Sequence, residues 1–361
     1  PDDAPNAIYD IDWSPDFTEY AVARRDGTTQ IVSASTGQVV RTIQSDLQGG
    51  TYGVAWHPTA STNLIATAGI DDLVKVWDAS TGNPIKTFDM RWGSVRVDWS
   101  PNGDRILGLG TSGVAKVWNY SSGSLIYEYQ TVSVAQATKW SSDSTQIAIA
   151  NGIGVEIIDA DLGTIEHELL GSRNFLDLDW HPVTNHLVTV DDGLCISIWD
   201  TSSGNEINSF CNTSLFPDFM LTVDYSSDGT EIITGDQNGQ IIYWDPTTWT
   251  PTQIIQNTGS VSSLAVGETG GVVLGDRAGN TLIINAPPVA AGTASHTISL
   301  LSLIPGIDPP PGGEEIGVVF DASASVDADG SIVEYKWGRS AGNGSIYTGT
   351  QATFFQNVTV S

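Results

Sequence analysis

The sequence predicts an all-β protein: a closed ring of seven sheets over residues 1–288, followed by a smaller β-sandwich over residues 289–361. Three observations lead to this prediction. One short phrase recurs seven times, short strand-like runs fill each interval, and the repetition stops after Asn285. The chain has 361 residues, more than a single core usually holds, so two domains or one large repeat fold is the expectation.

The recurring phrase is an aromatic residue followed by Ser or His and then Pro or Ser. It reads DWSPD, AWHPT, DWSPNG, KWSSD, DWHPV, DYSSDG and a decayed AVGET, at intervals of about 40 to 45 residues. Each unit holds four short runs, in the second unit YGVAW, LIATAG, LVKVW and PIKTF, separated by turns rich in Gly, Asp, Ser and Thr. Four strands in a repeat of this length are typical of a β-propeller blade.

A lone blade cannot bury both faces, so each sheet must pack on the next one around the ring. We therefore expect Val54, Trp56, Val97 and Trp99 in the core between blades. The seventh unit shows three strands and then AlaProPro at 286–288. Its outer strand is expected either upstream of Pro1 or in the run HTISLL at 296–301.

With these phrases the first region resembles the WD-repeat β-propellers. The Trp-Asp ending of that family occurs at Trp77-Asp78, Trp199-Asp200 and Trp244-Asp245. The family's turn aspartate matches Asp26 and Asp71, whereas the other five units have Ser112, Gly152, Gly193, Asn238 and Ala278 there. The Gly-His pair of the family is absent. The resemblance implies a seven-bladed interaction scaffold, without the family's eukaryotic partners.

The second region contains VFDASASVDADGSIVEYKW, which is similar to the PKD (polycystic-kidney-disease) module, an immunoglobulin-like sandwich. The usual WDFGDG continuation is replaced by WGRSAGNG, and the chain ends at FFQNVTVS, so the sandwich is partial. PKD modules usually occur in extracellular or cell-surface proteins. Together with an acidic composition like that of proteins from saline or marine habitats, this resemblance implies a prokaryotic extracellular or cell-surface protein.

The charge is strongly negative. Lys and Arg number 14 against 42 Asp and Glu, a net charge of −28. Such a chain repels phosphate backbones, so the sequence predicts no nucleic-acid partner. No apolar run approaches the ~20 residues of a membrane helix, so no direct membrane insertion is expected in this segment.

Catalytic and metal motifs are scarce. HExxH, GxSxG, the P-loop and paired CxxC are all absent, which favours a protein without catalytic residues or a cofactor. Asp327 and Asp329 resemble a fragment of a calcium loop, with a purely structural turn as the alternative. Asp12, Asp98, Asp179 and Asp224 precede the aromatic residue of an inner strand, where they would either bind a cation or, the favoured interpretation, satisfy neighbouring backbone. Cys195 and Cys211 fall almost opposite on adjacent strands, so either a disulfide or two free thiols is expected.

Partner-binding residues are expected in the loops that join one blade to the next, because these loops are not needed for the core. Aromatic and arginine residues dominate interface energetics, and three loops carry them: Arg91 and Trp92, Arg173 and Phe175, Phe216 and Phe219. The leading hypothesis is a non-catalytic scaffold that binds a protein or a surface polymer at these six residues. The alternatives are a structural subunit of a surface layer or filament, and an enzyme with its active site in the propeller channel.

Overall fold

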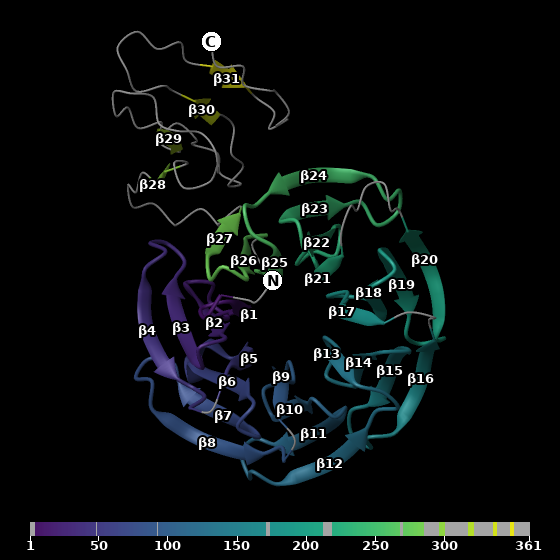
Figure 1. Ribbon diagram of the computed structural model, residues 1–361. Coiled ribbons are helices and arrows are strands. Elements are labelled where there is room, and N and C mark those ends of the chain that lie inside the picture. The colour runs from purple at the N-terminus through teal and green to yellow at the C-terminus, as the bar shows by residue number, and fades with distance from the viewer. Residues whose placement is uncertain are drawn as a thin grey trace. The chain divides into compact units, whose positions relative to one another are not determined.

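The computed structural model describes residues 4–47, 49–91, 93–170, 174–211, 219–267 and 270–284, and four short strands further along the chain. The chain divides into two compact units, Pro1–Pro287 and Pro288–Ser361. The first unit is a ring of seven antiparallel sheets, so the prediction of a seven-bladed β-propeller is confirmed (Figure 1).

Each blade is a meander that starts beside the axis of the ring and ends at its rim (Figure 1). The inner strands are β1 (Ile8–Trp13), β5 (Thr51–Trp56), β9 (Ser94–Trp99), β13 (Ala135–Trp140), β17 (Phe175–Trp180), β21 (Met220–Tyr225) and β25 (Val261–Val266). The second strands are β2 (Glu19–Arg24), β6 (Leu64–Gly69), β10 (Arg105–Gly110), β14 (Gln146–Asn151), β18 (His186–Asp191), β22 (Ile232–Asp236) and β26 (Val272–Asp276).

The third strands are β3 (Thr28–Ser33), β7 (Leu73–Asp78), β11 (Val114–Asn119), β15 (Gly154–Asp159), β19 (Cys195–Asp200), β23 (Gln240–Trp244) and β27 (Thr281–Ile284). The outer strands are β4 (Val39–Gln44), β8 (Pro84–Asp89), β12 (Leu125–Gln130), β16 (Ile165–Leu170), β20 (Asn205–Cys211) and β24 (Pro251–Gln256). Among the described residues, one 3₁₀ turn, η1 (Ala60–Thr62), lies between β5 and β6.

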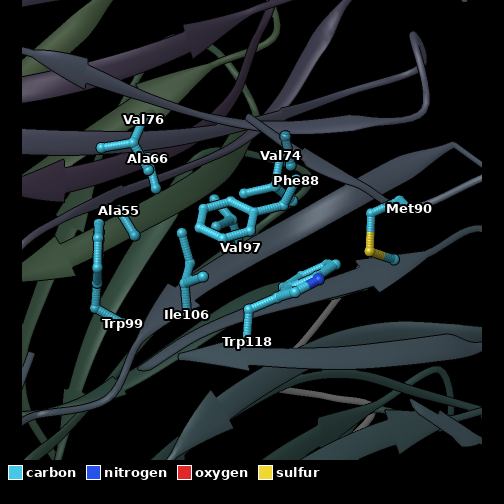
Figure 2. Close-up of a cluster of buried hydrophobic side chains, with 11 residues drawn as sticks. Ala55, Ala66, Val74, Val76, Phe88, Met90, Val97, Trp99, Ile106 and Trp118 are labelled. Carbon is cyan, nitrogen blue, oxygen red and sulfur yellow. The ribbon is translucent and has the colours of Figure 1, made fainter. Parts of the chain in front are cut away.

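The core lies between neighbouring blades, as the repeat predicts. Val54, Trp56, Val97 and Trp99 are all buried, with exposed fractions of 3 to 6%. Figure 2 shows the cluster between blades 2 and 3, where Val97 and Trp99 meet side chains such as Phe88 of blade 2. Burying such a side chain fully stabilises the fold by roughly 1.5–3 kcal/mol, so the stability of the ring resides in these interfaces.

A bulge re-aims the side chains of every inner strand. The register with the second strand shifts at the second residue of all seven, as between Ile8 and Asp10 in β1. After the bulge, alternate side chains point towards the axis or into the core, which gives β1 the burial pattern of buried Ile8, Ile11 and Trp13 with half-buried Asp10 and Asp12.

Some turns admit only glycine. Gly27 closes the turn between β2 and β3 at a φ of 80°, in the left-handed region. A Cβ at Gly27 would lie 2.2 Å from the carbonyl oxygen of Asp46. In blades 4 to 7 the turn between the second and third strands is held by the polar residue that ends the second strand, not by a residue at the family's turn-aspartate position. Asp191, for example, accepts hydrogen bonds from the backbone N–H of Gly193 (2.8 Å) and of Cys195 (3.2 Å).

Contacts between β1 and β25 close the ring. The backbone N–H of Ile11 donates to Ser263 Oγ (3.1 Å), and the indole N–H of Trp13 donates to the Ala265 carbonyl (3.0 Å). Blade 7 has three strands among the described residues. Within the run HTISLL, β28 (His296–Ser299) pairs with β29 (Gly317–Phe320), and an outer strand from this run stays a prediction. An outer strand from upstream of Pro1 stays a prediction.

In the second unit, β28 pairs with β29, and β30 (Tyr335–Trp337) pairs with β31 (Tyr347–Gly349). Both are two-stranded sheets, and the residues between these strands lie outside the described part of the chain. The PKD-like, immunoglobulin-like sandwich therefore stays a prediction.

Removing residues 289–361 should leave the propeller folded. Ring closure uses β1 and β25, which the truncated chain keeps. We expect the thermal midpoint of the propeller transition to move by less than about 3 °C, the shift that 1 kcal/mol produces in a domain of this size. Differential scanning calorimetry of both chains measures it. A fall of ten degrees would show that the second unit is part of the ring's stability.

Candidate functional site

The two ends of the ring differ in their connections. At the entry end, each outer strand leads into the inner strand of the next blade, and the second strand turns back into the third. The exit end carries the turns from first to second strand and from third to fourth strand. The three loops chosen from the sequence belong to the entry end.

Exposed apolar side chains gather at the entry end. They have exposed fractions of 42 to 85% and are Leu47, Ile70, Val132, Val134, Ile153 and Phe219. Among the described residues, the other large exposed apolar side chains lie on outer strands or, in the case of Leu162 and Val183, in exit-end turns. A concentration of apolar groups on loops is typical of an interaction surface.

Three of these residues form what we call the blade 4 patch: Val132, Val134 and Ile153. A buried polar network fixes the two loops that carry them. Glu156 Oε1 accepts hydrogen bonds from the Val132 backbone N–H (3.1 Å) and from the Asn151 side-chain amide (2.8 Å). Asn151 Oδ1 in turn accepts from the Ile153 N–H (3.0 Å). Because Glu156 and Asn151 are at most 2% exposed, the patch is held rigidly towards solvent.

Arg91 and Phe219, two of the six predicted partner residues, are exposed at the entry end. The side chain of Arg91 is 69% exposed and pairs with the equally exposed Asp89 at 3.4 Å, a contact that contributes little stability. Phe219 is 44% exposed. Trp92, Arg173 and Phe216 lie outside the described residues, so their role stays a prediction.

Phe175 is not an exposed contact residue, and its assignment to the binding surface needs correction. It is the first residue of β17, is 2% exposed, and packs against Trp199 with ring centroids 6.2 Å apart. The reason is the inner-strand bulge, which aims the first residue of the strand into the core. The sequence search also missed the blade 4 patch, because it looked for aromatic and arginine side chains rather than for Val and Ile in short polar loops.

The axial aspartates form hydrogen bonds between blades 1 and 2, 3 and 4, 5 and 6, and 6 and 7. Each carboxylate accepts the backbone N–H of the next inner strand: Asp12 from Trp56 (2.6 Å), Asp98 from Trp140 (2.9 Å), Asp179 from Tyr225 (2.9 Å) and Asp224 from Val266 (3.2 Å). Asp10 and Asp177, which the sequence search did not select, do the same for Val54 and Val223, both at 3.0 Å. This is the backbone-satisfying role favoured from the sequence.

One lysine balances part of this acidity. Lys139 Nζ lies 2.9 Å from Asp179 Oδ1 and 3.0 Å from Asp224 Oδ1. Burial pulls the pKa of Lys139 down, but the two carboxylates outweigh it and raise the pKa well above its usual value. Burial raises the pKa of Asp12 and of Asp98 to about 7.

An enzyme with its active site in the propeller channel would need ionisable groups that converge there, and such groups do lie together at the axis. Their carboxylates, however, accept the N–H groups of neighbouring strands, which assigns them to holding the ring. Within the described ranges, no three His, Cys, Asp or Glu side chains are placed to hold a metal ion. Asp327 and Asp329, the predicted calcium ligands, lie outside those ranges.

His57 and His181 stabilise exit-end turns. His57 Nδ1 accepts the Thr59 N–H (3.1 Å), and its Nε2 lies 3.2 Å from the Gly103 carbonyl of the next blade. His181 Nδ1 accepts the N–H groups of Val183 and Thr184, both at 3.1 Å. Burial lowers the pKa of both histidines, so both are neutral at pH 7 and act as structural residues.

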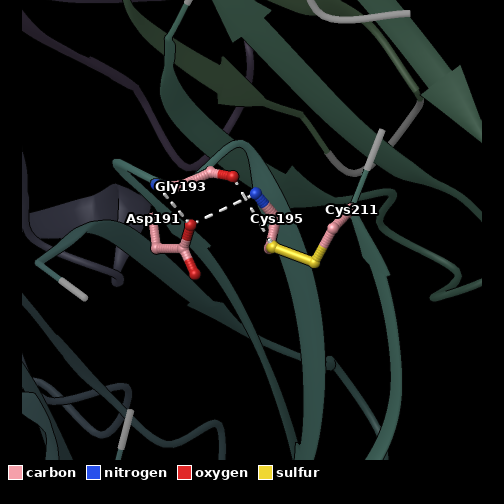
Figure 3. The surroundings of a disulfide bond; sticks show 4 residues. All are labelled: Asp191, Gly193, Cys195 and Cys211. Atoms are coloured by element: carbon pink, nitrogen blue, oxygen red, sulfur yellow. Dashed lines mark hydrogen bonds between the residues drawn. A yellow bond between two sulfur atoms is a disulfide. The ribbon is translucent and has the colours of Figure 1, made fainter. Parts of the chain in front are cut away.

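The cysteines meet across two strands. Cys195 and Cys211 form the last rung of the ladder between β19 and β20, and their sulfur atoms are bonded (Figure 3). The bond lies at the entry end, where β20 leaves blade 5.

Comparison with known proteins identifies two family matches. Residues 3–138 match the model of the eukaryotic translation initiation factor eIF2A, and residues 213–245 match the WD domain, G-beta repeat. The second match and the seven blades support a WD-repeat propeller.

Three similar proteins each match only part of the chain. Protein tipD of Dictyostelium discoideum is 22% identical over 67% of this chain and 30% of its own length. WD repeat-containing protein 1 of Mus musculus is 33% identical over 22% of this chain and 13% of its own. Eukaryotic translation initiation factor 3 subunit I of Drosophila willistoni is 23% identical over 56% of this chain and 67% of its own. The chain thus spans less than a third of the length of protein tipD and of WD repeat-containing protein 1.

These matches contradict one expectation. The sequence was interpreted as that of a prokaryotic extracellular or cell-surface protein, but its matches include eukaryotic translation initiation factors. That interpretation depended on the PKD-like segment and the acidic composition, and neither determines location. No helix in the described ranges is long and apolar enough to cross a bilayer.

Replacing Asp98 by Asn should stabilise the ring more at pH 8 than at pH 5. An amide oxygen still accepts the Trp140 N–H, but it carries no charge. Because the folded-state pKa of Asp98 is raised to about 7 from 3.8, the wild type loses stability as pH rises towards and through 7, and the variant does not. We expect the free energy of unfolding of the variant to gain about 1–3 kcal/mol on the wild type over this range.

Urea unfolding at both pH values measures this difference. Asp78→Asn is the matched control: hydrogen bonds from its own turn, led by the Ser80 hydroxyl, lower the pKa of Asp78, so the carboxylate is ionised throughout. An equal pH response of the two variants would contradict the role given to Asp98.

Proposed function

We propose that the propeller is a non-catalytic scaffold that binds a protein partner through its entry end. The observation that carries this proposal is the blade 4 patch. Its three aliphatic side chains are exposed although the loops that bear them are fixed from below by the buried Glu156 and Asn151. Rigid apolar groups lose little conformational entropy on binding, which favours a pre-formed contact surface.

The contrast between the two ends supports this choice. At the exit end, turn hydrogen bonds lower the pKa of Asp78, Asp200 and Asp228, so these carboxylates remain ionised and hydrated. A protein with a net charge of −28 presents such groups over much of its surface. The blade 4 patch offers three exposed aliphatic side chains that a protein surface can bury.

The test compares two variants of the full chain. In the patch variant, Val132, Val134 and Ile153 are each replaced by Ser. In the matched control, Leu162 and Val183 at the exit end, which are 70% and 79% exposed, are replaced by Ser. None of the five substitutions touches the core, so both variants should unfold like the wild type.

We expect the patch variant to lose at least tenfold in affinity for proteins that bind the wild type, since burying one such side chain is worth about 1.5–3 kcal/mol. The control should bind normally. Biolayer interferometry with each captured partner measures both affinities. Equal binding by the wild type and both variants would place the contact elsewhere, and loss in the control alone would move it to the exit end.

We also propose that the partner of the propeller belongs to a protein assembly of translation initiation. Its support is that two separate comparisons name translation initiation factors, over residues 3–138 and over 56% of the chain. The charge of the chain argues that contact would be made with protein rather than with RNA.

Sedimentation of a cell extract through a sucrose gradient tests this setting. We expect the wild-type chain to migrate with initiation-factor complexes and the patch variant to remain near the top. Migration of the wild type as a free chain at low salt would contradict the proposal while leaving the binding role of the entry end intact.

A further inference from the structure

The gap between blades 6 and 7 is filled differently from the other gaps of the ring. In the other six blades, the inner strand ends in an aromatic residue that packs against the preceding blade. These residues are 3 to 6% exposed and are Trp13, Trp56, Trp99, Trp140, Trp180 and Tyr225. In blade 7 the same position is Val266, the last residue of β25, which is only half-buried. The decayed phrase AVGET therefore leaves this gap without a large side chain from blade 7.

Blade 6 fills part of the gap from the other side. Tyr243 in β23 lies in the same hydrophobic cluster as Val266. At the equivalent position the other third strands carry Val or Ile, namely Ile31, Val76, Val117, Ile157, Ile198 and Ile283. Beside Tyr243 and Val266 there remains a cavity of about 360 Å³. This volume lies within the range of roughly 300–1,000 Å³ that is usual for sites of small ligands.

The cavity combines apolar surface with negative charge. Ile233, Val266 and the ring of Tyr243 supply the apolar surface. Asp228 and Glu231, from the turn between β21 and β22, supply two carboxyl groups, and none of the lining residues, all of which the structure describes, is basic. Hydrogen bonds within the turn, led by the Thr230 N–H, lower the pKa of Asp228, so its carboxylate is ionised at pH 7.

One buried polar group that lines the cavity has no partner in the protein. Tyr243 is 4% exposed, and among the described residues its hydroxyl has no hydrogen-bond partner. Burial raises the pKa of Tyr243, and the charge of Glu231 raises it further, so the hydroxyl is neutral and lies within the field of that carboxylate. A buried hydroxyl without a partner is costly, so a ligand that pairs with it gains from relieving that cost.

We propose that this cavity, which we call the blade 6–7 pocket, binds an organic cation: a primary ammonium group on a short alkyl chain. The ammonium donates hydrogen bonds to the Glu231 carboxylate and to the Tyr243 hydroxyl oxygen, and Asp228 adds a second negative charge. The alkyl chain covers Ile233 and Val266. Free alkylamines and the side chain of lysine share this chemistry.

The lining of the pocket favours this class of ligand over the alternatives. An anion would be repelled by the two carboxylates, and a neutral apolar molecule would leave them without a counter-charge. A metal ion does not use the apolar surface, and among the residues that the structure describes no three acidic, His or Cys side chains are placed to hold one. The pocket belongs to the exit end, so the proposal does not depend on the binding role of the entry end.

The test measures the binding of three probes to the full chain by saturation-transfer NMR titration. The probes are n-pentylammonium, its neutral counterpart 1-pentanol, and Nα-acetyl-lysine methylamide. For the wild type we expect saturable binding of n-pentylammonium near ~1 mM, at least tenfold tighter than that of 1-pentanol. Tighter binding of the lysine probe would identify a polypeptide side chain as the natural ligand, and tighter binding of n-pentylammonium would identify a free amine. Either order supports the pocket.

Two single variants remove one polar group each. Glu231→Gln keeps an oxygen that can accept the Thr252 hydroxyl, which now donates to Glu231 Oε1 at 2.5 Å, but it removes the charge. We expect it to weaken the binding of n-pentylammonium at least tenfold and to leave that of 1-pentanol unchanged. Tyr243→Phe removes only the hydroxyl and should weaken binding of the ammonium at least threefold.

Glu19→Gln is the matched control. Glu19 has the same place in the exit-end turn of blade 1, where its N–H donates to Ser14 Oγ (3.0 Å) as that of Glu231 donates to Ser226 Oγ (2.8 Å). The gap beside Glu19 is filled by Trp56. This variant changes the net charge of the chain as Glu231→Gln does, and it should bind n-pentylammonium like the wild type.

A double variant closes the pocket. Tyr243→Ile with Val266→Trp rebuilds the pair that Ile157 and Trp180 form between blades 4 and 5. We expect this variant to bind none of the three probes. If it does not fold, Glu231→Gln, which leaves the apolar core unchanged, still decides the question.

Three results would overturn the pocket: equal affinity of the wild type for n-pentylammonium and 1-pentanol, unchanged binding of the ammonium by Glu231→Gln, or the same loss in Glu19→Gln as in Glu231→Gln. The last result would show that the ammonium responds to the overall charge of the protein. None of these measurements involves the blade 4 patch, so the binding role of the entry end is tested separately.

Discussion

The whole ring depends on one constraint: each inner strand has a neighbour on one side only, and its other edge faces the axis. An unpaired backbone N–H in such a place costs about 1–3 kcal/mol when it is shielded from water. The chain meets this constraint with side chains from the preceding blade. Asp10 and Asp12 satisfy two N–H groups of β5, and Ser263 satisfies one of β1. These bonds tie blade 1 to blade 2 and blade 7 to blade 1, so they contribute to the closure of the ring.

The sequence predicted the architecture well because the repeat encodes it redundantly. Period, strand alternation and turn residues all point to seven blades, and the loss of a family motif in one unit changes little. Single positions were harder. Phe175 begins an obvious strand, but the bulge that turns it inward depends on pairing with β18, which no local pattern reveals. Likewise, Val132 and Ile153 come together through the buried Glu156, and that contact spans two separate loops. From the sequence, a disulfide and two free thiols were both possible, because the register between β19 and β20 decides whether the two cysteines lie opposite each other.

The acidity of the chain has two structural uses that composition alone does not separate. Exit-end aspartates accept hydrogen bonds within their own turns, as Asp78 does from Ser80 and Thr81, and these bonds keep them ionised. The axial Asp12 and Asp98 bridge neighbouring blades, and burial raises the pKa of both carboxyl groups. A net charge of −28 disfavours contact with RNA but does not identify a partner. Because many of the acidic residues form hydrogen bonds that hold the fold, an acidic composition does not indicate where the protein is located.

A ring held by many small contacts between blades is stable but leaves its rim weakly tied, because an outer strand has one ladder and one row of side chains. Elsewhere on the rim, noncovalent contacts to the next blade strengthen this tie: Lys86 donates to the Tyr120 carbonyl (2.5 Å), and Arg41 donates to the Ala79 carbonyl (3.0 Å). Blade 5 makes the longer Asn208 contact to Pro246, at 3.3 Å, from the middle of β20 and adds the covalent bond at the last residue of that strand. At blade 5 the disulfide thus adds a covalent tie to the backbone ladder between β19 and β20, while hydrogen bonds at the axis connect the blades.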